Sequence, residues 1–230
     1  MILEKRALCK FQDYYVSGDG SCVLILGDCY KVMGEALDNL PKFLLTDPPY
    51  GINFHADGVS TKKNIATKTS AKIIGDSQPF DPTPFVSFQD CLLWGANNFC
   101  QKLPAGGQWY FWDKVIQNGL KVRISEAEYC LHKRGTKPRG FRHLWSGNYR
   151  GSENGTKYHP SQKPVALMKW CLQLMGNPKA VFDPFAGSCP VGVACKRLGI
   201  GYVGVEVDPV HYQTAKERLI KSHKRGRFGL

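Results

Sequence analysis

The chain has 230 residues, of which 43% are hydrophobic and 22% charged, and its formal net charge is +12. This composition is typical of a globular protein and excludes a disordered or fibrous one. No run approaches 18 apolar residues and the amino terminus lacks the apolar core of a signal peptide, so we expect neither a membrane-spanning nor a secreted protein. The positive charge favours a polyanionic partner, with nucleic acid the first candidate.

The nine cysteines are odd in number, and no two of them have the C-x-x-C spacing of a zinc or redox site. Several lie inside apolar stretches, where cysteine acts as a small hydrophobic residue. We therefore expect reduced thiols in a cytoplasmic protein and no metal site.

The first third of the chain predicts a strand over Cys22–Gly27, a helix over Tyr30–Leu40 and a strand over Phe43–Thr46. A strand–helix–strand unit implies parallel strands with a right-handed crossover. Residues 53–76 are then expected to form a mobile loop that contacts DNA. The loop carries four lysines, Lys62, Lys63, Lys68 and Lys72.

The middle of the chain predicts a helix over Phe85–Leu103 and strands over Gln108–Trp112 and Glu126–His132. Basic residues interleaved with aromatic ones follow, a pattern that suits a nucleic-acid groove or, alternatively, a charged surface loop. The residues expected to contact DNA there are Arg134, Lys137, Arg139 and Arg142.

The last third alternates between helix and strand. The expected elements are a helix over Val165–Met175, a strand over Ala180–Phe182, a helix over Val191–Leu198, a strand over Tyr202–Val207 and a helix over His211–Lys221. The alternation predicts an α/β fold with a doubly wound, mostly parallel sheet in a single domain.

Asp47-Pro48-Pro49-Tyr50 directly follows the strand that ends at Thr46. Two prolines stiffen the backbone there, so the corner presents the Asp47 carboxylate, the Pro48 carbonyl and the Tyr50 ring to a planar guest. Two acceptors and a stacking surface are what an exocyclic amino group and its ring require. The alternative is a turn in which Asp47 merely caps the strand.

A second candidate site lies where the strand Ala180–Phe182 ends, in the segment Asp183-Pro184-Phe185-Ala186-Gly187-Ser188. Small residues before a helix let backbone N–H groups approach a ligand. Glu206 and Asp208 end the next strand, about 20 residues further on, which is the position of an acid that binds ribose hydroxyls. The pattern predicts an adenosine-containing ligand, and the Gly-Lys-Ser/Thr of a P-loop is absent here.

These motifs resemble those of the DNA amino-methyltransferases that use S-adenosylmethionine. The order resembles the beta class, a circular permutation of the Rossmann-like methyltransferase fold, because Asp47–Tyr50 precedes the loop at Asp183–Ser188. His159-Pro160-Ser161-Gln162-Lys163-Pro164, similar to the family's HPxQKP segment, stands between them. The resemblance spans roughly residues 22–220.

The resemblance implies roles for individual residues. The Asp47 carboxylate and the Pro48 carbonyl, which Pro49 follows in the chain, are implied to hold the target amino group. Tyr50 is implied to stack on the flipped base. The residues implied in cofactor binding are Asp28, His159, Lys163, Asp183, Phe185, Ala186, Gly187, Ser188, Glu206 and Asp208. Within this set, Glu206 is implied to bind the ribose and Asp28 to bind the adenine amino group of the cofactor. His159 and Lys163 are implied to lie near the carboxylate of the cofactor.

Two departures from the family pattern stand out. The loop usually continues Gly-Ser-Gly-Thr, whereas Cys189 and Pro190 follow Ser188 here, and cysteine adopts a positive φ less readily than glycine. The short distance from Trp145 to His159 also leaves no room for a separate target-recognition domain. Recognition of the target DNA sequence would then depend on the 53–76 loop, on residues 133–158 or on a partner.

The expected activity is methylation of the 6-amino group of adenine in DNA. Methylation of the cytosine 4-amino group is the nearest alternative, and an RNA or protein methyltransferase or a catalytically silent DNA-binding protein is also considered. The small size and the missing recognition domain suit a solitary phage or prophage enzyme. A restriction-modification component is the other setting expected for such an activity, and a homodimer is a further expectation.

Overall fold

The computed structural model describes residues 3, 8–53, 73–115, 125–146, 149–153, 158 and 162–222. All nine cysteines are free, as the sequence predicts. Among the described residues, no helix combines the length and the apolar character that crossing a membrane requires.

A nine-stranded sheet forms the centre of the molecule, in the order β1-β2-β11-β10-β3-β4-β6-β5-β7. The strands are β1 (Asp13–Val16), β2 (Cys22–Leu26), β3 (Phe43–Thr46), β4 (Asp90–Trp94), β5 (Gln108–Asp113), β6 (Ala127–His132), β7 (Arg139–Arg142), β10 (Ala180–Asp183) and β11 (Gly201–Glu206). A separate hairpin joins β8 (Trp145–Ser146) to β9 (Tyr149–Arg150).

Five adjacent strands, β2, β11, β10, β3 and β4, are parallel, so their carboxyl ends meet at one edge of the sheet. Strand β6 is antiparallel to β4 and β5, and its first residues therefore lie at that same edge. Both candidate sites follow carboxyl ends, after β3 and after β10, so the topology brings them together.

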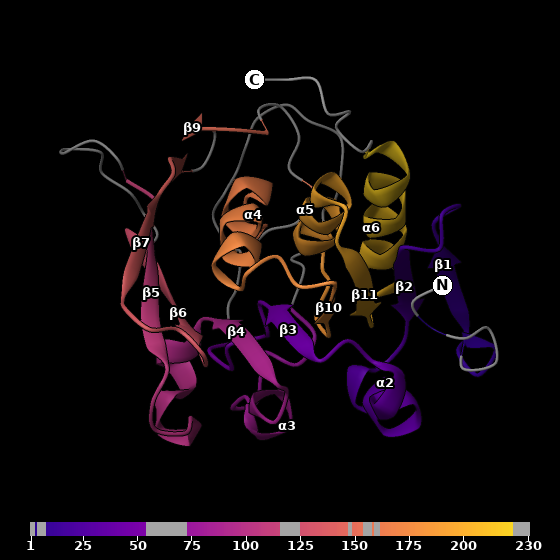
Figure 1. Cartoon of the computed structure of the whole chain (residues 1–230), viewed down its shortest axis with the longest axis horizontal. Helices are drawn as coiled ribbons and strands as arrows, with labels where there is room; N and C mark the ends of the chain where they lie inside the picture. The colour runs from indigo at the N-terminus through magenta and orange to yellow at the C-terminus, as the bar shows by residue number, and fades with distance from the viewer. Residues whose placement is uncertain are drawn as a thin grey trace.

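Helices cover both faces of the sheet (Figure 1). Helices α4 (Val165–Leu174), α5 (Pro190–Leu198) and α6 (Pro209–Lys221) lie on one face, and α2 (Cys29–Ala36) and α3 (Thr83–Val86) lie on the other. Two 3-10 helices, η1 (Leu37–Asn39) and η2 (Ala96–Lys102), complete the described elements. This is the doubly wound α/β arrangement that the sequence predicts.

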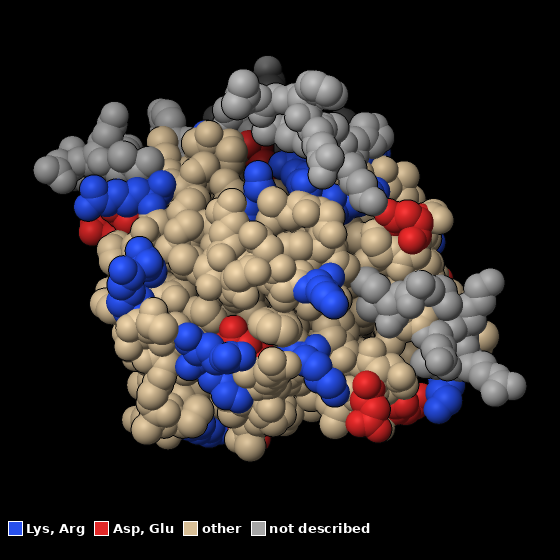
Figure 2. Space-filling view, viewed as in Figure 1, with Lys and Arg blue, Asp and Glu red and all other residues tan. Residues whose placement is uncertain are grey.

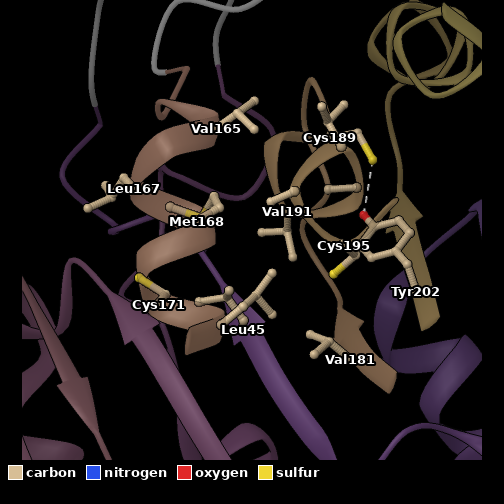
Figure 3. Packing of buried hydrophobic residues seen from close by; sticks show 14 of the residues in the cluster. Leu45, Val165, Leu167, Met168, Cys171, Val181, Cys189, Val191, Cys195 and Tyr202 are labelled. Atoms are coloured by element: carbon tan, nitrogen blue, oxygen red, sulfur yellow. Dashed lines mark hydrogen bonds between the residues drawn. The ribbon is translucent and has the colours of Figure 1, made fainter. Parts of the chain in front are cut away.

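Alternation along the strands divides the core into two layers. On β2, Leu24 belongs to the core beneath α4 to α6, whereas Val23 and Ile25 belong to the core beneath α2 and α3. Figure 3 shows the first layer, in which side chains of α4 and α5 pack over Leu45 and Val181.

The helix predicted over Phe85–Leu103 is wrong. The structure has α3, then the strand β4, then η2 in this stretch. All five residues of β4 are buried, so no polar alternation marks it as a strand, and a short apolar run of this kind reads equally well as part of a buried helix. Gly95, with φ +68°, separates β4 from η2. Strand β1 was not predicted.

Candidate active site

The Asp47–Tyr50 corner follows β3 at the carboxyl edge. The Tyr50 hydroxyl donates to Asp47 Oδ1 at 2.6 Å. The Tyr50 ring lies against Gly95 of the neighbouring strand end, where an added Cβ would lie 1.9 Å from Tyr50 Cε1. Gly95 therefore supplies both a positive φ and the space for this ring.

Lys163 brings a buried ammonium group into this corner from the segment before α4. Its Nζ lies 2.6 Å from Asp47 Oδ2, 2.9 Å from Glu128 Oε2 and 3.0 Å from the Tyr50 hydroxyl. The resemblance places Lys163 near the cofactor carboxylate, but the structure pairs it with the two acids of the corner. His159 lies outside the described residues.

Glu128 and Lys114 join the same network, although the sequence motifs assigned a role to neither residue. Glu128 is the second residue of β6, and Lys114 directly follows β5. Lys114 Nζ lies 2.8 Å from Glu128 Oε1 and donates to Ser125 Oγ at 3.0 Å. Two carboxylates thus face two ammonium groups, so the charges of the corner balance.

The network sets the protonation of its members. Burial raises the pKa of Glu128, but Lys163 and Lys114 outweigh it and hold that pKa at about 2. Burial likewise raises the pKa of Asp47, against the opposing attraction of Lys163. Burial lowers the pKa of Lys163, but the two acids outweigh it and raise that pKa, so Lys163 stays a charged hydrogen-bond donor and is not a nucleophile.

Tyr50 stays a phenol in these surroundings, because burial and the two nearby carboxylates raise its pKa. Its hydroxyl, which donates to Asp47 and contacts Glu128 Oε2 at 3.3 Å, fixes the ring as one wall of the corner.

The loop after β10 is held by Glu206, the last residue of β11. Glu206 Oε2 accepts from the Gly187 N–H at 2.7 Å and its Oε1 accepts from the Asp208 N–H at 2.9 Å. Burial raises the pKa of Glu206, and these two N–H bonds oppose the rise. Each carboxylate oxygen retains a lone pair that can face a ligand in the cleft.

Asp183 links the two halves of the site. Its Oδ1 accepts from Thr46 Oγ1 at 2.7 Å, next to Asp47, and its Oδ2 accepts from the Tyr202 hydroxyl at 3.2 Å. Burial raises the pKa of Asp183 to about 7, although these hydrogen bonds oppose it. These contacts tie β10 to β3 through Asp183 itself.

Cys189 occupies the position where the family pattern has glycine, and it adopts φ +61° as the residue before α5. Its thiol donates to the Tyr202 hydroxyl at 3.3 Å (Figure 3). Gly192 leaves room for this pair, since an added Cβ there would lie 2.4 Å from Cys189 Sγ. Pro190 is the first residue of α5, a position that proline tolerates.

Ser188 is joined to the segment that carries Lys163 through a buried arginine of α6. Arg218 donates to the Ser188 carbonyl and Oγ and forms an ion pair with Glu153 at 3.0 Å. Glu153 Oε1 in turn accepts from the Val165 N–H at the start of α4. No local motif in the sequence marks this connection.

Asp28 and Asp208 both cap helices. Asp28 accepts from the Tyr30 N–H at the start of α2, and Asp208 accepts from the Val210 and His211 N–H groups at the start of α6. Both also line the cleft described next, so the capping role does not remove them from a ligand's reach.

A continuous cleft of about 1030 Å³ opens along the carboxyl edge. Its lining includes Asp47, Tyr50 and Glu128 at one end and Phe185, Gly187 and Glu206 at the other. Phe185 packs against Phe80 and Phe85, with ring centroids 5.7 and 5.4 Å away. The cleft is large enough for two adjoining ligands, one at each end.

The basic residues expected to contact DNA do not form one surface. Arg142 ends β7 beside the cleft edge, whereas Arg134 and Lys137 follow β6 at the opposite edge, and Arg139 begins β7. All four side chains are exposed, and Figure 2 shows Lys and Arg atoms spread over the side where β5 to β7 lie. Lys62, Lys63, Lys68 and Lys72 lie outside the described residues. On either side of that stretch, the Asn53 N–H donates to the Asp76 carbonyl at 2.8 Å.

Comparison with known families supports the resemblance drawn from the motifs. Residues 109–217 match the family model described as DNA methylase. YubD of Escherichia coli (strain K12), whose name describes it as a methylase, is 27% identical over 216 residues, which cover 85% of this chain and 88% of YubD. Type II methyltransferase M2.LlaDCHI of Lactococcus lactis subsp. cremoris is 31% identical over 100 residues, 43% of this chain and 37% of that protein.

Solved structures share the fold. The cytosine-N4-specific PvuII DNA methyltransferase has a TM-score of 0.54 and 14% identity, and the match covers 86% of each chain. The complex of M1.HpyAVI with S-adenosylmethionine has a TM-score of 0.50 and 20% identity, covering 85% of this chain and 98% of that one. The α/β fold class predicted from the sequence is confirmed.

Proposed function

We propose that this chain transfers a methyl group from S-adenosylmethionine to the 6-amino group of adenine in DNA, a proposal that the match of residues 109–217 to the DNA methylase model and the likeness to YubD support. The observation that carries the proposal is the shared cleft, in which the Asp47 corner and the loop held by Glu206 lie at opposite ends.

The cofactor end of the cleft fits an adenosyl ligand. Glu206 is a buried carboxylate whose oxygens can accept from two ribose hydroxyls, and Asp28 can accept from the adenine amino group. Phe185 and Gly187 line the same end of the cleft as Glu206. When bound, S-adenosylmethionine supplies an electrophilic methyl group on a sulfonium, so neither a metal nor a covalent nucleophile is required.

The Asp47 corner activates the acceptor. An aromatic amine is a poor nucleophile because its lone pair is delocalised into the ring. Hydrogen bonds from its two hydrogens to the Asp47 carboxylate and the Pro48 carbonyl favour a pyramidal nitrogen with a localised pair. Burial, which raises the pKa of Asp47, suits this carboxylate to take the proton that the nitrogen loses after methylation. Positioning and electrostatics then account for the rate.

The target base reaches the corner by leaving the duplex. Extrusion costs a few kcal/mol, which stacking on the Tyr50 ring partly offsets. The net charge of +12 supplies attraction to the phosphates, so DNA binding weakens steeply as salt rises. A leading Asp in the corner motif favours adenine over cytosine within the family that the chain resembles.

The experiment is identification of the modified nucleoside. Purified protein is incubated with DNA and methyl-labelled S-adenosylmethionine, the DNA is hydrolysed, and the nucleosides are separated by mass spectrometry. Labelled N6-methyl-2′-deoxyadenosine is the expected product. Labelled 4-methylcytosine would move the activity to cytosine, and label in competing RNA but not in DNA would overturn the proposal.

A further inference from the structure

Three aromatic side chains stand exposed on the outer face of β5 and β6. Trp109, Phe111 and Tyr129 are 40%, 39% and 46% exposed. Phe111 and Tyr129 are directly opposite one another in the antiparallel pair, and Trp109 lies two residues before Phe111 on the same face of β5. Exposed aromatic residues grouped in this way usually mark a binding surface. We call these three residues the aromatic strip.

The neighbouring strand β7 is shaped around this strip. Gly140 pairs with Phe111, and a Cβ added to Gly140 would lie 2.4 Å from Phe111 Cζ. The Phe111 ring therefore lies over the bare backbone of β7, where any other residue would displace it. Such a ring keeps the face that does not contact the backbone available for stacking.

The strip continues into the cleft and carries positive charge beside it. Tyr129 itself lines the cleft, close to Glu128 of the Asp47 corner. Arg142 lies on the same face of β7 as Gly140, and its side chain is 78% exposed, 3.7 Å from Asp113 Oδ2. The ion pair with the half-buried Asp113 uses only part of this exposed guanidinium group, whose other N–H donors can bind a phosphate.

Spacing and chemistry together indicate the occupant. Opposite residues of an antiparallel pair lie about 5 Å apart, and alternate residues of a strand about 7 Å. Rings at this spacing suit successive unpaired bases, each with an accessible face, and not a duplex, whose base faces are covered. A flipped target base already unpairs the strand where it enters the cleft.

We propose that the aromatic strip stacks unpaired bases next to the target base, with Arg142 holding their phosphate backbone. The inference rests on the proposed function, because that function identifies the bound strand as DNA. It assigns recognition of the opened strand to β5–β7, a role that a separate recognition domain would otherwise fill.

The test compares single-stranded and duplex DNA of the same mixed sequence, by fluorescence anisotropy at fixed salt. Trp109→Leu and Phe111→Leu keep a β-compatible apolar side chain but remove the ring, and Phe111→Tyr restores one. Gly140→Val removes no ring but displaces that of Phe111. The matched control is Leu37→Ala, an apolar residue 51% exposed on η1 and outside the cleft.

Each Leu variant and Gly140→Val should lose about tenfold in affinity for single-stranded DNA, the loss expected for one stacking partner, with duplex binding within about twofold of wild type. Phe111→Tyr and Leu37→Ala should bind both as wild type does. Unchanged single-strand affinity, or an equal loss on both DNAs, would overturn the proposal. So would light scattering that shows a dimer for wild type and a monomer for Phe111→Leu, because the strip would then be a subunit interface.

The nucleoside assay separates this inference from the proposed function. If wild type methylates DNA and the ring variants bind single strands normally, the proposed role of the aromatic strip is refuted and the enzyme assignment stands. If the ring variants lose single-strand binding but wild type labels no DNA, the strip stands as a nucleic-acid surface and the methyltransferase assignment fails.

Discussion

Lys163 Nζ lies 2.6 Å from Asp47 Oδ2, where the proposed function requires the amino group of a base to bind. The ammonium group is itself an amine with hydrogens directed at this carboxylate, so it occupies one of the positions that the substrate needs. Glu128, 2.9 Å from the same Nζ, is an alternative partner for Lys163 when a base enters. The buried charge of Lys163 therefore keeps a carboxylate partner while the base takes its place at Asp47.

Removing this cation should change the pH dependence of the reaction. Without the ammonium group of Lys163, which opposes the rise in the pKa of Asp47, the carboxylate remains protonated to higher pH. We expect Lys163→Met to shift the acidic limb of the kcat/KM profile upward by about one pH unit or more. Lys216→Met, which removes a lysine on α6, is the control, and an unshifted limb in Lys163→Met would contradict this account of the network.

Glu128 should stabilise the fold in an acid-dependent way. Its pKa is lowered on folding from 4.5 to about 2, so its contribution is present above about pH 4.5 and is lost as the pH falls toward 2. The shift corresponds to about 3 kcal/mol as an order of magnitude. Urea unfolding at several pH values between 7 and 3 should show a steeper loss of stability for wild type than for Glu128→Gln.

The exposed neighbour Glu126 provides the control for that comparison, because its side chain lies outside the network. Glu126→Gln should follow the wild-type curve. Parallel curves for wild type and Glu128→Gln would show that the ion pairs with Lys163 and Lys114 do not stabilise the folded state.

Glu206→Gln should weaken cofactor binding. The carboxylate accepts from the Gly187 and Asp208 N–H groups through different oxygens, and an amide has only one acceptor oxygen to offer. One of the two N–H groups then faces an NH₂ group, which disturbs the loop that we propose holds the cofactor. Calorimetric titration should give a loss in S-adenosylmethionine affinity of about tenfold or more, corresponding to about 1.4 kcal/mol. Glu217→Gln, an exposed change on α6, should bind normally.

Much of the fold could be predicted because its signals are local. The strand Phe43–Thr46 was predicted with its observed bounds, and the strands ending at Asp183 and Glu206 were predicted to within a residue or two. Proline, glycine and acidic residues mark these ends, and the parallel topology then brings the ends to one edge. Predicting two sites at carboxyl ends was therefore enough to anticipate one cleft.

The charge network of the corner could not be predicted in this way. Lys163, Glu128 and Lys114 come from three separate segments, and their meeting depends on β6 running antiparallel between β4 and β5. No spacing in the sequence reports that arrangement. Glu128 belongs to none of the motifs to which the sequence assigned a role.

Cys189 should tolerate glycine better than a β-branched residue. At φ +61° a β-branched side chain is strained, and the pocket beside Tyr202 and Gly192 is filled. We expect Cys189→Thr to lower the unfolding free energy by about 1–3 kcal/mol. Cys189→Gly relieves the backbone strain but loses the contact with Tyr202. Because these effects oppose each other, its unfolding free energy should stay within about 1 kcal/mol of wild type. Thermal unfolding of both variants checks the order, and equal stability would contradict it.

The rate of methyl transfer in Asp47→Asn tests the proposed amino-group clamp most directly. Asparagine keeps the shape but not the charge that holds the amine and takes its proton. In a single-turnover assay at saturating S-adenosylmethionine and DNA, we expect a rate about 10²–10³-fold below wild type, the usual cost of losing one such electrostatic contact. The affinities for both ligands should stay within about threefold, and Asp38→Asn, an exposed change on η1, should react normally. Wild-type turnover in Asp47→Asn would contradict the clamp.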